Sequence, residues 1–370
     1  MELPEGMVMR EPSSHYQPIP GQEDVEDTSR RYRAGKDGPW TEERTKLHDE
    51  IMARHIYKNG VSGELAFDVV PLNESPTLVM LGGGSGAGKG GLAREMKGRM
   101  KARGKKGAAK VDADELRQML PEFDEIVALG REDAAAITHE EASYLNKRIA
   151  DEIARLRGNL IWDGTGNGRL EKFIGKVERF KKIAAGLPVY DEEGKLLYAA
   201  VAANKGGKAV RVVNRYATTS VDEAIKRTFK RGRDSGRYVP ARITHGTHSG
   251  VSEIWEDAVR EGVFDYTKDA AGEAARAAGE ITGELWDTNF RPNVKIAEVR
   301  GRTLDILDKE RWFQFRLKAP DYKLEEWYGP SFVRPAIRPH GERFWPPSEA
   351  VQYGVPLKSQ TWFKVGTRRR

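Results

Sequence analysis

A glycine-rich segment with one lysine is the part of the sequence whose residue types point most directly to chemistry. Glycines let successive backbone N–H groups converge on phosphate oxygens without steric conflict from Cβ atoms, and a following helix adds its positive end. The lysine supplies a charge for the β and γ phosphates of a nucleotide. We therefore predict a nucleoside triphosphate site formed by Gly83, Gly84, Ser85, Gly86, Ala87, Gly88, Lys89, Gly90 and Gly91.

The residues after Lys89 depart from the usual phosphate-binding loop. That motif ends in Lys-Ser or Lys-Thr, whose hydroxyl reaches a magnesium ion, whereas this chain has Gly90 and Gly91. Magnesium could be held instead through water, by Ser85 or by an acidic residue, and the sequence does not choose among these. The metal ligands therefore stay unassigned, although Mg²⁺ with ATP or GTP is the expected cofactor pair.

A second group of reactive residues is acidic and follows another apolar run. Asp112 and Asp114 come directly after Val111, and the segment Pro121-Glu122-Phe123-Asp124-Glu125 follows. Carboxylates at the end of a strand can act as a general base or as metal ligands. Either aspartate could instead cap the helix that begins here.

These residues need elements that bring them to one edge of a sheet. Short apolar runs alternate with helical periodicity, which favours an α/β fold with a parallel sheet flanked by helices. Function is expected where the strands end. The four runs are Thr77 to Leu81, Ala108 to Val111, Asn159 to Trp162 and Ala209 to Val213.

Helices are predicted between and before these runs. Thr41 can cap a helix that carries Leu47 and Ile51 on one face. Thr138 and Glu141 have capping-box spacing for a later helix. The stretch 187–208 contains a turn between short strands and is interpreted as an insertion.

The order of these motifs resembles the zeta-toxin family of kinases from about Trp40 to Asn289. The similar segments are an Asp-x-Asp followed by Pro-x-Phe-Asp-Glu, the segment Asp163-Gly164-Thr165-Gly166, and two arginine-bearing elements around Arg227 and Arg237. The family has glutamate where this chain has Asp163. The resemblance implies that Lys89 binds phosphate, that Asp114 is the general base, and that Arg227 and Arg237 bind the triphosphate.

The same resemblance implies the acceptor. Family members phosphorylate UDP-N-acetylglucosamine or related UDP-amino-sugars, so we expect a kinase acting on a sugar hydroxyl, with an antitoxin or a phage protein as a candidate partner. The expected acceptor contacts are Asp112, Glu141, Asp163 and Thr165. Arg231 could substitute for Arg227. His245 and His248 have no carboxylate at metal-ligand spacing and receive no metal.

Composition sets the wider limits. The 370 residues carry a net charge of +6, contain no cysteine and include no apolar run long enough for a membrane helix, so we expect a cytoplasmic protein without membrane contacts. The expected organisation is a proline-containing arm at 1–39, a kinase domain at 40–305, and at 306–370 a helix followed by a basic extension with proline and tryptophan.

Two other functions stay open from the residues. One is a kinase acting on a polynucleotide end or a modified base, which the positive charge permits. The other is a degenerate domain kept for binding or structure, such as in a phage particle, which Gly90, Gly91 and the tail favour. The retention of Lys89 and Asp114 in family order argues for an enzyme.

Overall fold

The fold is described from a computed structural model of the chain. The described residues are 27–34, 38–101, 107–129, 134–164, 166, 170–191, 193–235, 239, 241–260, 281–301 and 303–319. Everything below refers to these residues.

The described part of the chain is built on a seven-stranded sheet with the order β2-β3-β1-β6-β7-β8-β9. The first five strands in this order run parallel, and β8 and β9 continue the sheet in antiparallel fashion. The strands are β1 (Thr77–Gly82), β2 (Ala109–Asp112), β3 (Leu160–Asp163), β6 (Arg211–Thr218), β7 (Ile281–Asp287), β8 (Val294–Arg300) and β9 (Thr303–Ile306).

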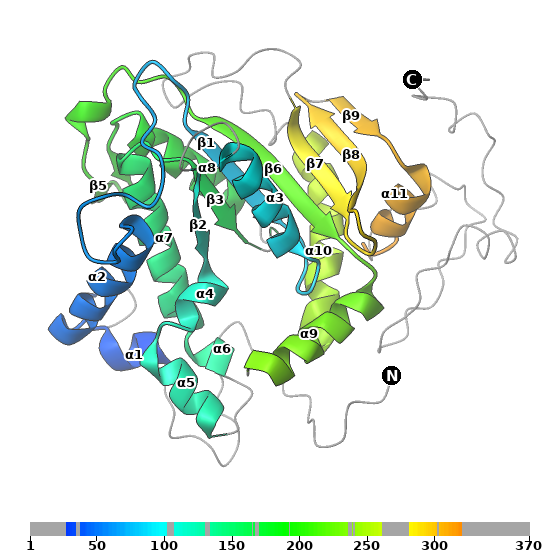
Figure 1. The fold of residues 1–370 in the computed structure, drawn as a ribbon, viewed down its shortest axis with the longest axis horizontal. Coiled ribbons are helices and arrows are strands. Elements are labelled where there is room, and N and C mark those ends of the chain that lie inside the picture. The colour runs from blue at the N-terminus through cyan, green and yellow to red at the C-terminus, as the bar shows by residue number, and fades with distance from the viewer. Residues whose placement is uncertain are drawn as a thin grey trace, which may run out of the picture.

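Helices cover both faces of this sheet (Figure 1). The α-helices of the described residues are α1 (Thr28–Tyr32), α2 (Glu42–Ile56), α3 (Lys89–Lys101), α4 (Ala113–Arg117), α5 (Pro121–Ala128), α6 (Ala134–Ile137), α7 (His139–Arg155), α8 (Leu170–Ala184), α9 (Val221–Ser235), α10 (Ala241–Arg260) and α11 (Lys309–Arg316). The confirmed architecture is therefore the expected parallel sheet flanked by helices.

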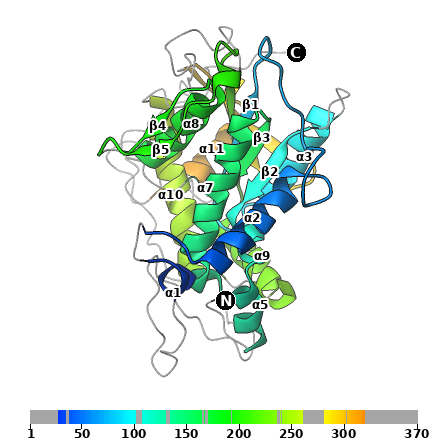
Figure 2. The ribbon, with the colours of Figure 1, turned by 90° about the vertical axis from the view of Figure 1, so that its left-hand side faces the viewer.

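Among the described residues, three of the four buried apolar clusters include residues of the sheet. On one face, Leu92 of α3 packs with Val79 and Ile161 of the sheet. On the other face, α2, α7 and α8 pack around Leu160, and α10 and α11 pack around Leu285. Figure 2 shows α2 and α7 next to β2 and β3, with α1 and α5 at their lower ends. The sheet is thus buried along its centre, which fixes the strand ends that carry the site.

The register of the parallel strands brings three strand ends together. Leu81 of β1 pairs with Asp163 of β3, and Asp163 pairs with Asp112 of β2. The phosphate-loop glycines follow β1 directly, and α9 follows β6. In Figure 1 the ends of β2 and β6 lead down into α4 and α9 at the same edge of the sheet.

Several local predictions are confirmed. Thr41 caps α2 by accepting a hydrogen bond from the Arg44 N–H at 3.3 Å. The predicted insertion contains β4 (Val189–Tyr190) and β5 (Leu196–Tyr198), an antiparallel pair.

Other local predictions differ from the structure. The fourth predicted strand, at 209–213, is present as β6, which begins at Arg211 and continues to Thr218. Strands β7 to β9 were not predicted. The capping box of Thr138 and Glu141 does not form, because the Thr138 hydroxyl donates to Ala134 O at 2.7 Å and makes no cap bond to α7.

Each of the two predicted extensions contains a helix that packs against the predicted kinase domain. Within the predicted arm, α1 lies against α7. Within the predicted C-terminal extension, Trp312 and Phe315 of α11 pack into the cluster with Trp255 of α10. No helix in the described ranges combines the length and apolarity needed to cross a membrane.

Candidate active site

The segment between β1 and α3 folds as a compact phosphate-binding loop. The Lys89 ammonium turns back and donates to the carbonyl oxygens of Gly83, at 2.9 Å, and Gly84, at 3.3 Å. Gly86 has a φ of +72°, and a Cβ there would lie 2.5 Å from Ala224 O of α9. The glycine at this position is therefore required both by the left-handed backbone and by the close approach of α9.

The two glycines after Lys89 lie in the first turn of α3. A Cβ on Gly90 would meet only Arg94 Nη1, at 3.8 Å, whereas a Cβ on Gly91 would lie 3.3 Å from Arg291 Nη1. Position 90 thus has room for a side chain. Steric crowding therefore does not explain why position 90 lacks the hydroxyl that usually reaches magnesium.

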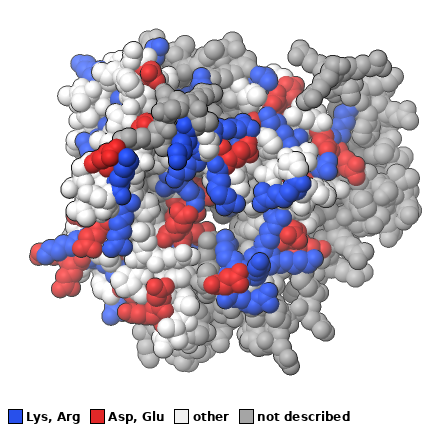
Figure 3. All heavy atoms as spheres, in the orientation of Figure 1, with Lys and Arg blue, Asp and Glu red and all other residues white. Residues whose placement is uncertain are grey.

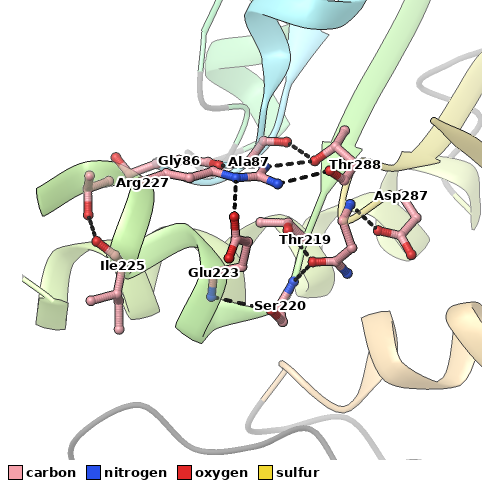
Figure 4. Close-up of polar contacts among 12 residues, drawn as sticks. Gly86, Ala87, Thr219, Ser220, Glu223, Ile225, Arg227, Asp287 and Thr288 are labelled. Atoms are coloured by element: carbon pink, nitrogen blue, oxygen red, sulfur yellow. Dashed lines mark hydrogen bonds and ion pairs between the residues drawn. The ribbon is translucent and has the colours of Figure 1, made fainter. Parts of the chain in front are cut away.

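Arg227 of α9 reaches across to the outer side of this loop (Figure 4). Its guanidinium donates to Gly86 O at 3.3 Å and to Thr288 O at 3.0 Å, while Glu223 accepts from its Nε at 2.9 Å. The Thr288 hydroxyl in turn donates to Ala87 O at 2.6 Å. The structure therefore brings Arg227 to the predicted nucleotide loop, where it also braces the loop backbone.

The two aspartates after β2 play different local roles. Asp112 is the N-cap of α4, because its Oδ1 accepts a hydrogen bond from the Asp114 N–H at 2.9 Å. The capping role considered for Asp112 is thus confirmed. The Asp114 carboxylate is partly exposed and forms an ion pair with Arg117 at 3.1 Å. Burial lowers the pKa of that arginine to about 10, although Asp112 opposes the shift.

Asp163 lies at the end of β3 and is buried beside the loop lysine. Burial raises its pKa from 3.8 to about 6, Lys89 opposes this rise, and Asp112 adds to it. Among the described residues no hydrogen bond to this carboxylate relieves the cost of burial. Asp163 is consequently a carboxylate that gains from any cation placed next to it.

Arg231 lies one helical turn beyond Arg227 on α9. Burial lowers its pKa, and Asp112 and Asp163 act in the opposite direction, so the guanidinium is near these carboxylates. The position places Arg231 on the carboxylate side of the site. Its predicted contact with the nucleotide stays a prediction.

Glu141 was predicted to contact the acceptor, and it is fully buried in another cluster. Arg44 binds both its oxygens, at 2.5 and 2.7 Å, and His48 Nε2 lies 2.6 Å from Oε1. Arg44 also pairs with Glu122 through two hydrogen bonds of 2.8 Å. These contacts give Glu141 a structural role between α2 and α7, and they do not favour an acceptor contact.

Sequence reasoning missed two residues of α10 that hold the loop. The Ser85 N–H donates to Thr247 Oγ1 at 3.0 Å, and His248 Nε2 lies 2.9 Å from Ser85 O. His248 is buried and Thr247 half-buried, and α10 carries many other polar residues, so no local pattern in the sequence singles out this pair. Two other predicted site residues, Thr165 and Arg237, lie outside the described residues.

The candidate site contains both basic and acidic side chains. On the face seen in Figure 3, Lys and Arg gather across the middle of the molecule with acidic residues among them. Within the described ranges, no group of three His, Cys, Asp or Glu side chains could hold a metal by itself. The arrangement suits polyanionic phosphate, which a set of cations and backbone N–H groups can bind.

A parallel sheet flanked by helices, with a glycine-lysine loop after β1 and carboxylates at neighbouring strand ends, defines the P-loop kinase class. Residues 65–184 match the family model described as zeta toxin, so this segment is a zeta-toxin-like kinase domain, which is a nucleotide-dependent phosphotransferase. The matched segment contains Lys89, Asp112, Asp114 and Asp163. It ends before Arg227.

Solved structures with a similar arrangement have low sequence identity. The AvrRxo1-ORF1:ORF2 complex with ATP is 15% identical with a TM-score of 0.47, covering 80% of this chain and 82% of that one. The PezAT chromosomal toxin-antitoxin system of Streptococcus pneumoniae is 13% identical with a TM-score of 0.43, covering 70% and 81%. No curated protein matches the sequence of this chain.

Proposed function

We propose that this chain transfers the γ-phosphoryl group of ATP or GTP to a hydroxyl of a UDP-amino-sugar. The observation that supports this most directly is the placement of Lys89 beside Asp163, one strand away from Asp112. A loop for the triphosphate therefore adjoins carboxylates that can receive an acceptor. Residues 65–184 match the zeta-toxin model, which supports a kinase. The sugar acceptor, an antitoxin partner and a location in the cytoplasm are part of the proposal and follow from the resemblance of the sequence motifs.

The residues divide into a nucleotide side and an acceptor side. Lys89 and the loop N–H groups bind the phosphates, and Arg227 with Arg237 neutralises charge that develops during transfer. Asp114 accepts or orients the proton of the acceptor hydroxyl. The remaining acceptor contacts are Asp112, Asp163 and Thr165.

Magnesium suits this set of donors. It prefers carboxylate oxygens, and it commonly binds through one or two of them together with water and substrate phosphates. Asp163 would hold it, because this buried carboxylate has a pKa raised to about 6 and lies beside Asp112. When bound, the ion would neutralise charge on the phosphates of the nucleotide.

The test is phosphoryl transfer by the purified full chain. The protein is incubated with magnesium and γ-labelled ATP or GTP, together with UDP-N-acetylglucosamine, other UDP-amino-sugars, DNA or RNA in separate reactions. We expect label on a UDP-amino-sugar with the wild-type protein and none with Lys89→Ala. Lys89→Ala should also weaken triphosphate binding strongly, measured by calorimetry on folded protein.

Other outcomes separate the alternatives. Label on DNA or RNA ends, with none on sugars, would establish the polynucleotide kinase instead. Triphosphate binding without transfer to any acceptor would point to a degenerate domain. Equal nucleotide affinity in wild type and Lys89→Ala would remove the basis of the proposal.

A further inference from the structure

Ser85 of the phosphate-binding loop is held at both of its backbone groups by two consecutive residues of α10. Its N–H donates to Thr247 Oγ1 at 3.0 Å, and its carbonyl oxygen lies 2.9 Å from His248 Nε2. A carbonyl oxygen can only accept, so Nε2 carries the hydrogen and donates it. Ser85 and Thr247 are 162 positions apart in the sequence, so this is a tertiary contact and not a local turn.

Holding Ser85 fixes the two peptide planes on either side of it. In a planar trans peptide the C=O and the following N–H point in opposite directions. Because the Ser85 N–H points to Thr247, the carbonyl of Gly84 must point away from α10. It does so, and it accepts the Lys89 ammonium at 3.3 Å.

The same geometry applies to the next peptide. Since the Ser85 carbonyl points to His248, the N–H of Gly86 must point away from α10. That is the side on which Gly84 presents its carbonyl to Lys89. A backbone N–H beside the loop lysine is the kind of donor that binds a phosphate oxygen.

We propose that Thr247 and His248 are positioning residues that orient the Ser85 peptide planes so that the Gly86 N–H faces a nucleotide phosphate. This inference rests on the proposed nucleotide site. It adds that a helix distant in sequence determines the direction of one phosphate donor.

The surroundings of His248 suit this role. Its side chain is buried, and a Cβ on Gly84 would lie 2.3 Å from its Cδ2, so only glycine lets the loop lie on the imidazole ring. Burial, with Lys318 and Lys89 nearby, holds the pKa of His248 well below 6.5, which keeps the ring neutral. The Thr247 hydroxyl donates to Thr244 O at 2.9 Å, which leaves its lone pairs to accept from Ser85.

The experiment compares paired variants in the full chain. Thr247→Val keeps the shape of the side chain but cannot accept from Ser85, whereas Thr247→Ser keeps the hydroxyl. His248→Phe keeps a ring under Gly84 but loses the donor, whereas His248→Gln places an N–H near the position of Nε2. Calorimetry with ATP and with inorganic tripolyphosphate should show affinity about tenfold weaker for Thr247→Val and His248→Phe. Thr247→Ser and His248→Gln should be close to wild type.

A matched control lies one turn earlier on the same helix. Thr244 is buried and its hydroxyl has no hydrogen-bond partner among the described residues, so Thr244→Val should leave both affinities unchanged. The amide resonance of Gly86 should shift when tripolyphosphate is added to wild type and to Thr247→Ser. It should stay in place with Thr247→Val.

The outcomes distinguish this inference from the proposed function. If wild type binds neither ATP nor tripolyphosphate, the nucleotide site itself is wrong. If wild type binds both and the folded Thr247→Val and His248→Phe variants bind equally well, the positioning role is wrong. If His248→Phe does not fold, the Thr247→Val and Thr247→Ser pair decides alone.

Discussion

Asp112 and Asp163 pair in register at the ends of the adjacent parallel strands β2 and β3. Two carboxylates at one sheet edge repel each other, and burial adds to the cost for Asp163, whose pKa rises to about 6. Lys89 opposes this rise. The site therefore carries a negative charge that is energetically unfavourable, and a bound magnesium ion would reduce that cost.

Asp163→Asn should make the protein more stable at pH 7. The shift from 3.8 to about 6 corresponds to roughly 3 kcal/mol as an upper estimate. Between these pH values the folded state holds a proton that the unfolded state releases, so wild-type stability falls as pH rises through this window. The stability advantage of the Asp163→Asn variant should be largest above pH 6 and should vanish below about pH 4.

Urea unfolding at pH 4 and pH 7 measures this effect. Asp305→Asn on β9 is the control, because Asp305 is exposed and its replacement should change little at either pH. Phosphoryl transfer should fall in Asp163→Asn despite the gain in stability. A variant less stable than wild type at pH 7 would contradict the electrostatic account.

Asp114→Asn should abolish phosphoryl transfer while nucleotide affinity stays within a few-fold of wild type. Loss of a general base acts on the chemical step and not on ground-state binding. Asp112→Asn should reduce the rate less, because Asp112 caps α4 and an asparagine can still accept from the Asp114 N–H. Single-turnover rates and calorimetry on both variants check the order. A larger loss in Asp112→Asn would reverse the assignment.

Gly90→Thr should lower the magnesium concentration needed for half-maximal activity or leave it unchanged. Position 90 has room for a side chain, and threonine restores the hydroxyl that usually reaches the ion. Gly98→Thr is the matched control, because Gly98 lies on the same helix and a Cβ there would meet nothing within 4 Å. Both changes should raise helix stability slightly, and Gly98→Thr should leave the magnesium dependence at its wild-type value. An inactive wild type revived by Gly90→Thr would show that the native loop is defective.

Much of the fold could be predicted because its signals are local. The loop follows an apolar strand and precedes a helix, so Lys89 and its glycines could be placed from the sequence alone. Strand ends next to each other in a parallel sheet follow from the alternation of strands and helices, and this brought Asp112 and Asp163 to one edge. The cap at Thr41 is a contact with the N–H of Arg44, three positions later, and could be predicted for the same reason.

The missed features depend on contacts between distant segments. Strands β8 and β9 extend the sheet in antiparallel fashion after β7, and nothing in the βα alternation signals such an addition. The hydrogen bond from the Ser85 N–H to Thr247 joins residues that come together only in the folded chain. Glu141 has capping-box spacing, but its carboxylate accepts a hydrogen bond from the buried side chain of Arg44 of α2 instead.

Replacing that arginine should affect stability and not catalysis. Arg44 lies between Glu122 and Glu141, and all three side chains are nearly buried. Arg44→Met would leave two buried carboxylates without their cation and should lower the free energy of unfolding by about 3 kcal/mol. Lys46→Met, on the same helix, should cost no more than about 0.5 kcal/mol, because its pair with Glu42 is exposed.

Glu141→Gln separates the structural role of this carboxylate from an acceptor contact. The variant should lose stability in urea unfolding, because Glu141 is fully buried against Arg44 and His48. Below the temperature at which it unfolds, its KM for the sugar acceptor should equal that of wild type, since the carboxylate is enclosed between α2 and α7. A raised KM with unchanged stability would instead restore Glu141 to the acceptor site.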